Sequence, residues 1–199
     1  AELPPLEPPL VGDATAVDEL PASPAAQPVC AAMQRWIDVL RMQPHPEGGW
    51  YAESFRSSAV VTPTLNGAAC PPRPSATACY FLLQGGHRSA LHRLAHDEVW
   101  CFHDGQPVKL HLLGVQDTLC TVVLGRDPCR GELPSFVVPG GTWFGATVDR
   151  DVSHYALVSC LVTPGFDFAD FELGARGPLC EQFPQHTTFV RSMTREHAP

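Results

Sequence analysis

Residues 86–105 read GHRSALHRLAHDEVWCFHDG and hold the densest run of histidine and acidic residues in the chain. A glycine stands at each end, which is typical of the turns that bound a short strand. Side chains two apart on a strand share a face, so Glu98, Trp100 and Phe102 point one way while Val99 and Cys101 point the other. If Glu98 faces the interior of the protein, that interior holds a carboxylate beside two aromatic rings.

Short strand-like segments continue on both sides of this stretch. They are four to ten residues long, rich in Val, Leu, Phe, Tyr and Thr, and bounded by Gly, Pro and Asp. The predicted strands are Trp50–Arg56, Thr77–Gln84, Val99–Phe102, Val108–Leu113, Leu119–Leu124, Ser135–Val138, Thr142–Ala146 and His154–Thr163. Such strands at near-regular spacing, with no helices between them, predict an all-β sandwich or barrel.

Helical patterns occur at the two ends of this region. Met33, Trp36, Ile37 and Leu40 recur at the spacing of one helix face, which predicts a helix over residues 29–41. Pro44 then ends the helical pattern. A short C-terminal helix is expected over Gly177–Phe183.

Length and charge exclude several classes of protein. The chain has 199 residues, with 13 Lys and Arg against 21 Asp and Glu and a net charge of −8. No basic stripe is present, so nucleic acid is not an expected partner. No apolar run approaches the roughly 18 residues of a membrane-spanning helix, so we expect no membrane partner. Residues 1–28 are rich in Pro and Ala and predict a flexible tail before a single domain at 29–199.

The eight cysteines contain no CxxC pair. Cys79, Cys101, Cys120 and Cys160 lie in apolar strand-like runs, where a free thiol behaves as a small hydrophobic side chain. We therefore expect buried thiols rather than a disulfide framework, and an intracellular location, cytoplasmic or organellar.

The stretch at 86–105 resembles the first motif of the cupin superfamily, a small β-barrel of jelly-roll type. Gly86, His92, Glu98 and Gly105 stand at the spacings of that motif, but Leu94 holds the place of its second histidine. Residues 135–144 resemble the second motif, and Phe144 there holds the place of another histidine.

A narrower resemblance covers most of residues 36–195. The segments HPEGGW (45–50), LHR (91–93), DEVW (97–100), VPGGTWF (138–144) and PGFDF (164–168) are similar to the cupin family often labelled "predicted sugar epimerase". This resemblance implies a single jelly-roll barrel with an N-terminal helix and a short C-terminal helical segment. It also implies a homodimer, in which pairing hides exposed strand edges.

The resemblance extends to the metal-independent sugar epimerases that share this fold, in which a His acts as base and a Tyr as acid on a 4-keto sugar. His92 is then the expected base, with Glu98 or Asp97 orienting its ring. Tyr155 or Tyr80 is the expected acid. The alternative for Tyr155 is burial as a core aromatic, and both interpretations remain open.

Substrate contacts are expected from aromatic and charged side chains. Trp100, Phe102 and Trp143 are predicted to line a cavity where rings stack on a sugar or a nucleotide base, although they equally suit a filled barrel. Glu53 and Arg56 follow the HPEGGW segment, and Arg56, Arg88 and Arg93 are the candidates to hold a phosphate or carboxylate. The expected partner is a small molecule, a sugar or a nucleotide-sugar.

Two alternatives to this epimerase hypothesis remain. In a metal-dependent cupin enzyme, an oxygenase, lyase or isomerase, one divalent ion would be held by His92 and Glu98 with His96 or His154. In a non-catalytic cupin, the aromatic cavity would store or bind a small ligand. Because two of the usual four metal ligands are missing, no cofactor is our leading expectation. The Phe-rich segment 166–171 is expected to pack on the barrel without a catalytic role.

Overall fold

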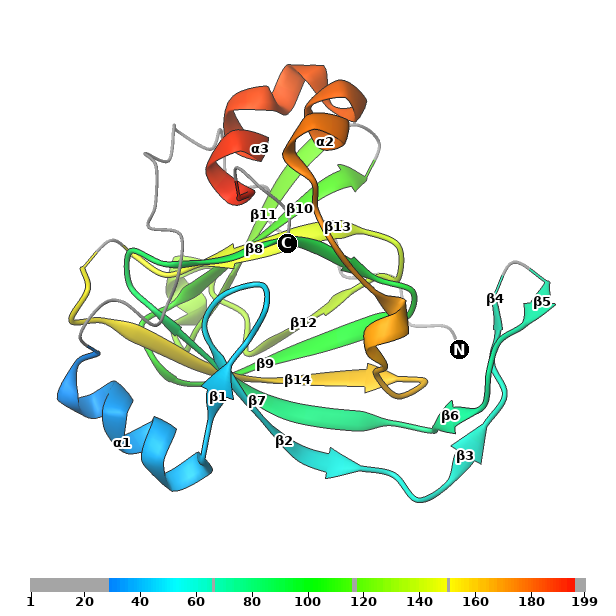
Figure 1. Ribbon diagram of the computed structural model, residues 1–199. Coiled ribbons are helices and arrows are strands. Elements are labelled where there is room, and N and C mark those ends of the chain that lie inside the picture. The colour runs from blue at the N-terminus through cyan, green and yellow to red at the C-terminus, as the bar shows by residue number, and fades with distance from the viewer. Residues whose placement is uncertain (1–28, 66, 116–117, 150, 196–199) are drawn as a thin grey trace.

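Two antiparallel sheets face each other in the computed structural model, which describes residues 29–65, 67–115, 118–149 and 151–195 (Figure 1). The six-stranded sheet has the order β1-β2-β7-β14-β9-β12 and the five-stranded sheet the order β11-β10-β13-β8-β15. Their strands are β1 (Gln43–Pro44), β2 (Trp50–Arg56), β7 (Thr77–Gln84), β8 (Arg88–Leu94), β9 (Asp97–Gly105), β10 (Val108–Val115), β11 (Thr118–Leu124), β12 (Ser135–Val138), β13 (Trp143–Thr147), β14 (Tyr155–Thr163) and β15 (Phe171–Leu173). This is the expected all-β jelly-roll barrel.

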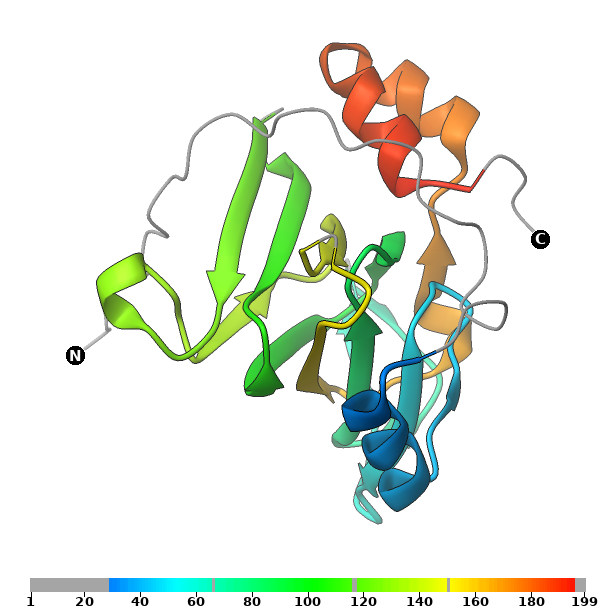
Figure 2. The ribbon, with the colours of Figure 1, turned by 90° about the vertical axis from the view of Figure 1, so that its left-hand side faces the viewer.

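Further short strands and helices lie outside the barrel. The pairs β3 (Val60–Val61) with β6 (Arg73–Pro74) and β4 (Thr64–Leu65) with β5 (Ala68–Ala69) form an arm that projects from it (Figure 1). The helices are α1 (Ala31–Leu40), α2 (Arg176–Gln182) and α3 (Thr187–Met193), with 3-10 turns at Pro128–Arg130, Phe168–Asp170 and Pro184–His186. Figure 2 shows α1 on one side of the barrel and α2 and α3 on the opposite side.

Three apolar clusters hold these layers together. The largest fills the space between the sheets and includes Leu110, Val122 and Phe144. A second joins the outer face of the five-stranded sheet to α2 and α3, and a third joins the six-stranded sheet to α1 through Met33. Fully burying one such side chain stabilises the fold by roughly 1.5–3 kcal/mol. The three clusters therefore join the two sheets to each other and to the helices on their outer faces.

Strand bounds agree closely with the sequence-based predictions. Predicted and observed bounds coincide for β2, β7 and β12. Strand β9 is longer than expected because its pairing with β14 continues to both ends. The sequence analysis missed β8, β15 and α3. In β8, polar residues such as Ser89 and His92 are buried, so its apolar side chains do not alternate with exposed ones.

Three further expectations concern the cysteines, residues 1–28 and membrane-spanning helices. All eight cysteines are free thiols, as expected, but of the four expected to be buried only Cys160 is buried, and Cys79, Cys101 and Cys120 are half-buried. The predicted tail at 1–28 lies outside the described residues. In the part of the chain that is described, no helix combines the length and the apolar character needed to cross a membrane.

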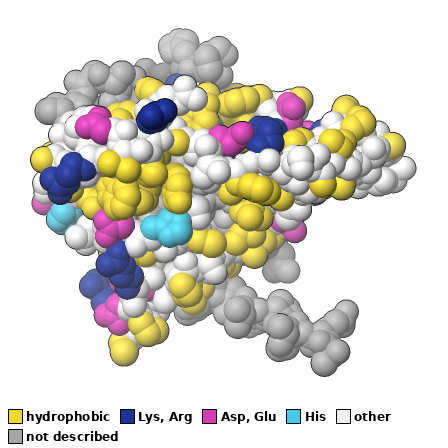
Figure 3. Space-filling view, turned by 90° about the horizontal axis from the view of Figure 1, so that it is seen from below, with side chains coloured by type: hydrophobic (Ala, Val, Ile, Leu, Met, Phe, Trp, Pro, Cys, Tyr) yellow, Lys and Arg dark blue, Asp and Glu magenta, His cyan; other side chains and the backbone are white. Residues whose placement is uncertain are grey.

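The outer face of the six-stranded sheet carries exposed apolar side chains. Val137 of β12 and Leu161 of β14 are 47% and 37% exposed. Figure 3 views the molecule from below, and hydrophobic side chains gather there among charged ones. The expected homodimer stays a prediction.

Candidate functional site

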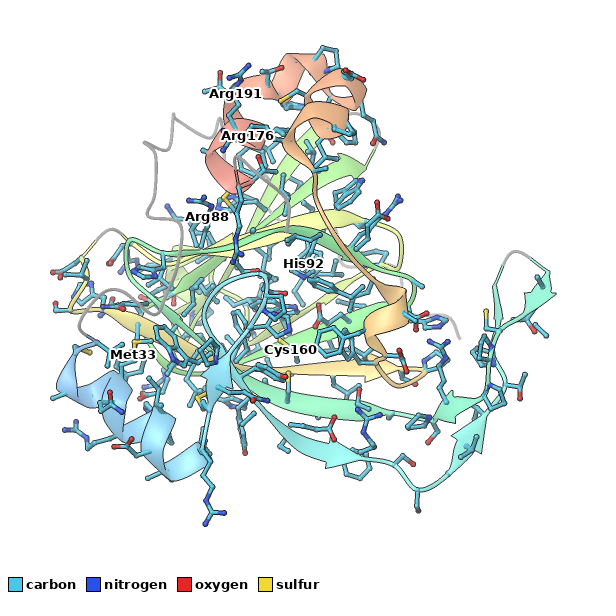
Figure 4. All side chains as sticks on the ribbon, in the orientation of Figure 1. Met33, Arg88, His92, Cys160, Arg176 and Arg191 are labelled. Carbon is cyan, nitrogen blue, oxygen red and sulfur yellow. The ribbon has the colours of Figure 1, made fainter. Side chains whose placement is uncertain are left out.

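A cavity of about 380 Å³ lies between the two sheets, within the size range of small-molecule sites. Both sheets contribute to its wall, together with the loop before β2 and the segment before β15. Its lining residues are Gln43, His45, Glu47, Tyr51, Glu53, Arg56, Thr77, Ala78, Cys79, Phe81, His92, Leu94, Glu98, Trp100, Cys160, Val162, Phe166, Asp167, Phe168 and Phe171. Figure 4 shows His92 between the layers, with Cys160 on the opposite sheet.

The loop of residues 45–49 carries a carboxylate into this cavity. Gly48 and Gly49 have φ angles of +116° and +71°, which side-chain-bearing residues rarely adopt. A Cβ atom at Gly48 would also overlap the carbonyl oxygen of Arg88. The two glycines therefore let the loop lie against β8, where the Ala90 amide donates to the Glu47 carbonyl at 2.8 Å.

Glu47 is buried, and its two carboxylate oxygens have different partners. One oxygen accepts a hydrogen bond from the Ser89 hydroxyl at 2.7 Å. The other lies 3.3 Å from Nδ1 of His45 and 3.4 Å from Nε2 of His92. Burial alone would raise the pKa of Glu47, but the two imidazoles and the Ser89 hydroxyl lower it to about 2. Glu47 is therefore an anion at neutral pH.

The tautomer of His92 follows from its hydrogen bond. Nδ1 lies 2.8 Å from the Ala90 carbonyl oxygen, and a carbonyl only accepts, so Nδ1 carries the proton. Nε2 is then the nitrogen that faces Glu47. Burial lowers the pKa of His92, and this outweighs the opposing effect of the Glu47 carboxylate. With a proton on Nδ1, the neutral imidazole takes up a further proton at Nε2, next to the Glu47 carboxylate.

Glu98 is the second buried carboxyl group of the cavity. Burial raises its pKa to about 8, and the negative charge of Glu47 adds to that effect. Its Oε2 atom has no hydrogen-bond partner. Glu98 is therefore a neutral acid at pH 7, with a proton to donate.

The structure brings five of the predicted site residues together. His92, Glu98, Trp100, Glu53 and Arg56 all line the cavity. Arg56 forms a paired contact with Glu53, from Nε to Oε1 at 2.9 Å and from Nη2 to Oε2 at 2.5 Å. The Arg56 guanidinium is thus already paired with the Glu53 carboxylate at the wall of the cavity.

Three other predicted contact residues lie elsewhere. Phe102 shares the face of Glu98 and Trp100, as the alternation predicts, but it packs against the filled end of the barrel. Trp143 points outward from β13 into the cluster under α2 and α3. Arg93 lies over the Trp143 ring at 4.6 Å and pairs with Glu172 at 2.6 Å. The expectation that Trp143 and Arg93 line the cavity is corrected because their strand positions face out of the barrel.

Tyr155 also lies outside the cavity. Its hydroxyl donates to Asp104 at 2.7 Å and lies 3.3 Å from the indole nitrogen of Trp36 in α1. The interpretation of Tyr155 as a packed aromatic with a polar contact therefore fits its placement. The structure does not bring it together with His92.

Sequence reasoning overlooked several wall residues. Glu47 and His45 belong to the quoted HPEGGW segment, so the signal was present, but nothing local placed them beside His92. Phe166, Phe168 and Phe171, expected to pack without a role at the site, line the cavity. The Phe171 ring stacks on His92 with centroids 5.5 Å apart, and the Phe168 ring stacks on His45 at 6.2 Å.

Apolar side chains hold the two motif positions that would otherwise supply metal ligands. Leu94 lies in the wall where a ligand would be needed, and the Phe144 ring packs on His92 with centroids 4.2 Å apart. His154 pairs with Asp149 and His96 lies near Asp170, both outside the cavity lining. Among the described residues, no three or more His, Cys, Asp and Glu side chains gather as a metal site. The expectation of no cofactor stays a prediction.

Comparisons with known proteins agree with this architecture. A family model described as "Cupin superfamily (DUF985)" matches residues 34–174. A solved structure of a hypothetical protein from Leishmania major is 39% identical, with a TM-score of 0.75, covering 84% of this chain and 99% of its own. A structure from Shewanella oneidensis is 37% identical, with a TM-score of 0.74, covering 82% and 98%. An uncharacterized protein of Saccharomyces cerevisiae is 28% identical over 160 residues, which are 70% of this chain and 74% of that protein.

Proposed function

We propose an activity for this chain on the premise that it belongs to the cupin superfamily, in the family described as Cupin superfamily (DUF985). The proposed activity is a metal-independent isomerisation or epimerisation. It moves a proton next to the carbonyl of a small, carbohydrate-like keto substrate, with His92 as the general base.

One observation carries this proposal: the cavity holds two carboxyl groups whose pKa values are pushed apart, to about 2 for Glu47 and about 8 for Glu98. Two carboxyl groups with separated pKa values in one pocket are a recurrent sign of acid and base roles. Glu47 lies 3.4 Å from the base nitrogen of His92, and Glu98 supplies an acid at neutral pH.

The proposed chemistry uses these groups in order. Nε2 of His92 takes the proton from the carbon beside the substrate carbonyl, and the anionic Glu47 stabilises the imidazolium that forms. The Glu98 carboxyl donates its proton to the carbonyl oxygen as that oxygen gains negative charge. Delivery of a solvent proton to the opposite face of that carbon gives the epimer, and transfer of the His92 proton to the former carbonyl carbon gives the isomer. In both cases Glu98 recovers its proton from a substrate oxygen.

The aromatic residues in the rest of the cavity wall suit a ring-shaped ligand. Tyr51, Phe81, Trp100, Phe168 and Phe171 offer aromatic surface to the cavity. Rings of this kind stack on sugars and on nucleotide bases. A nucleotide-linked sugar is included in the proposal on this ground.

Solvent deuterium exchange tests the proposal directly. A panel of free and nucleotide-linked keto sugars is incubated with the protein in D₂O, and incorporation at carbon is followed by NMR. We expect exchange with wild type, a loss of about 10²–10⁴-fold in His92→Asn and a comparable loss in Glu98→Gln. Glu172→Gln, an exposed position outside the cavity, is the matched control and keeps the wild-type rate. Equal exchange in wild type and His92→Asn would reject the base role.

Ligand binding without turnover is the second candidate, and the aromatic wall favours it. It predicts saturable binding of a panel member with no exchange above the buffer rate. A metal-dependent cupin activity would need ligands beyond His92 and Glu98 that the described residues do not gather.

A further inference from the structure

We propose that Cys79 and Cys160 are a redox-modification site, a dithiol that a peroxide converts to a disulfide within the cavity wall. The modification itself requires no particular activity of the cavity. Its effect on function rests on the proposed role of Glu98.

Strand register brings the two thiols together. β7 and β14 are antiparallel neighbours, and Cys79 lies directly opposite Cys160. Directly opposed residues in such a pair have Cα atoms about 4.5–5.5 Å apart. A disulfide needs about 4.4–6.8 Å, so no strand has to move for the bond to form.

Both thiols also point to the same side of the sheet. Each lines the cavity, and the two residues occupy directly opposed positions on the facing strands. Cys79 therefore has a second thiol as its cross-strand neighbour, inside a pocket of the size that admits small molecules.

The other strand cysteines have different partners. Cys101 of β9 lies opposite Ser159 and Ser135, and Cys120 of β11 lies opposite Leu112. Among the described strands, register opposes one cysteine to another only at Cys79 and Cys160. Cys101 is therefore a matched control from the same sheet.

The two thiols have unequal access to an oxidant. Cys79 is half-buried, whereas Cys160 is 4% exposed and its pKa is raised by burial. Cys79 is therefore the thiol that a peroxide reaches first. Its thiolate attacks one peroxide oxygen, the O–O bond breaks, and Cys79 becomes a sulfenic acid while the other oxygen leaves as water.

The second step closes the disulfide. The Cys160 sulfur attacks the Cys79 sulfur and displaces its hydroxyl group, which leaves as water with the Cys160 proton. In total, two thiols and one hydrogen peroxide give one disulfide and two waters. The sulfurs are oxidised and the peroxide oxygens are reduced.

The disulfide is expected to affect Glu98, the proposed acid. The Cys160 thiol contacts the Glu98 carboxyl group, so the disulfide removes an S–H donor from Glu98. It also replaces two separate thiols of the wall with one rigid bridge. We expect the oxidised protein to exchange substrate protons more slowly than the reduced protein, and a thiol reductant to restore the rate.

Disulfide mapping tests the proposal on the native, full-length protein. The reduced protein is treated with hydrogen peroxide, remaining thiols are alkylated under denaturing conditions, and peptides are analysed by mass spectrometry. We expect a peptide pair joined through Cys79 and Cys160 that disappears after reduction. The pair persists in Cys101→Ser and is lost in Cys79→Ser, while circular dichroism checks that each variant is folded.

Two results would overturn the proposal. One is full alkylation of Cys79 and Cys160 under conditions in which the exposed Cys129 is oxidised. The other is an equal yield of disulfides between other cysteines. Because mapping uses no substrate, a clean Cys79–Cys160 bridge without any proton exchange would retain this site while rejecting the proposed activity.

Discussion

His92 and His111 are both buried in the five-stranded sheet, on strands β8 and β10 that flank β13. They point to opposite sides of it. His92 faces the cavity between the sheets, whereas His111 packs under α3, where its ring lies 5.5 Å from that of Phe189. His92 and His111 therefore show the same residue type, similarly buried, in two different environments.

Their ring nitrogens have different partners. His111 places Nδ1 3.0 Å from the Thr121 hydroxyl and Nε2 2.9 Å from the Thr147 hydroxyl. Burial, with a smaller effect of Lys109, lowers its pKa to about 4. Both nitrogens contact hydroxyl groups and His111 does not line the described cavity, so we assign it a structural role. In His92, Nδ1 donates to the Ala90 carbonyl, whereas Nε2 lies in the cavity wall 3.4 Å from the Glu47 carboxylate. Burial alone does not mark a functional histidine; a ring nitrogen beside a carboxylate in a cavity does.

The largest expected difference is in proton exchange. In His92→Asn the amide still donates to the Ala90 carbonyl, but the base is removed, so exchange falls by about 10²–10⁴-fold. His111→Asn retains the wild-type exchange rate once the folded fraction is matched. Both rates come from deuterium incorporation into the same keto-sugar panel. Equal losses in the two variants would remove the distinction between the two histidines.

The pH dependence of folding stability tests the protonation state of Glu98 in the cavity. Its folded pKa of about 8 lies above the unfolded value of 4.5, so the native state retains a proton that the unfolded state releases. The resulting contribution favours folding most below pH 4.5 and declines as pH rises to about 8, by several kcal/mol at ~1.4 kcal/mol per pKa unit. Glu98→Gln removes this slope.

Urea unfolding of wild type and Glu98→Gln at pH 5 and pH 8.5 measures the effect. The variant gains stability relative to wild type at the higher pH. Parallel pH profiles would contradict the protonated state assigned to Glu98, whereas Glu172→Gln should leave the wild-type profile unchanged.

The pH dependence of folding stability also tests His111, for which stability is expected to fall as the pH falls. Its folded pKa of about 4 lies below the unfolded value of 6.5, so the unfolded state takes up a proton first as pH falls. Its contribution to stability is complete above pH 6.5 and is lost between pH 6.5 and 4, by roughly 3 kcal/mol. His111→Gln flattens this acid limb in a series of urea titrations. An unchanged limb would show that His111 titrates normally.

The smallest expected effect is at Tyr155. Tyr155→Phe removes the hydrogen bond to Asp104 and costs about 1 kcal/mol of folding stability. The exchange rate stays at the wild-type value, because the hydroxyl lies outside the cavity. Thermal unfolding and deuterium exchange on one preparation measure both quantities. A loss of exchange as large as that of His92→Asn would return Tyr155 to the role of acid.

Local patterns predicted much of the barrel. The bounds of β2 and β7 and the shared face of Glu98 and Trp100 follow from side-chain alternation and from turn residues, which act over a few positions. The same alternation left open which face of β13 is inside, and no strand was predicted over the residues of β8. Trp143 and Arg93 were therefore placed in the cavity although they face α2 and α3 or solvent.

The candidate site itself combines residues from distant parts of the chain. His92 and Glu98 were found because they lie in one motif. Their partner Glu47 comes from a loop far earlier in the sequence, and Phe171 comes from far later. No local period connects such positions, because their contact depends on how the sheets close.

By itself, the sequence determined the strand-rich architecture, the spacing of His92 and Glu98 within one motif, and the pair of glycines that Glu47 precedes. These are properties of alternation, spacing and backbone freedom, which are encoded locally. Only the tertiary structure decided that Glu47 meets His92, that Glu98 is buried without a charge partner and that Tyr155 lies outside. Barrel closure sets those distances and buries the two carboxyl groups, and both effects together separate the pKa values on which the proposed chemistry rests.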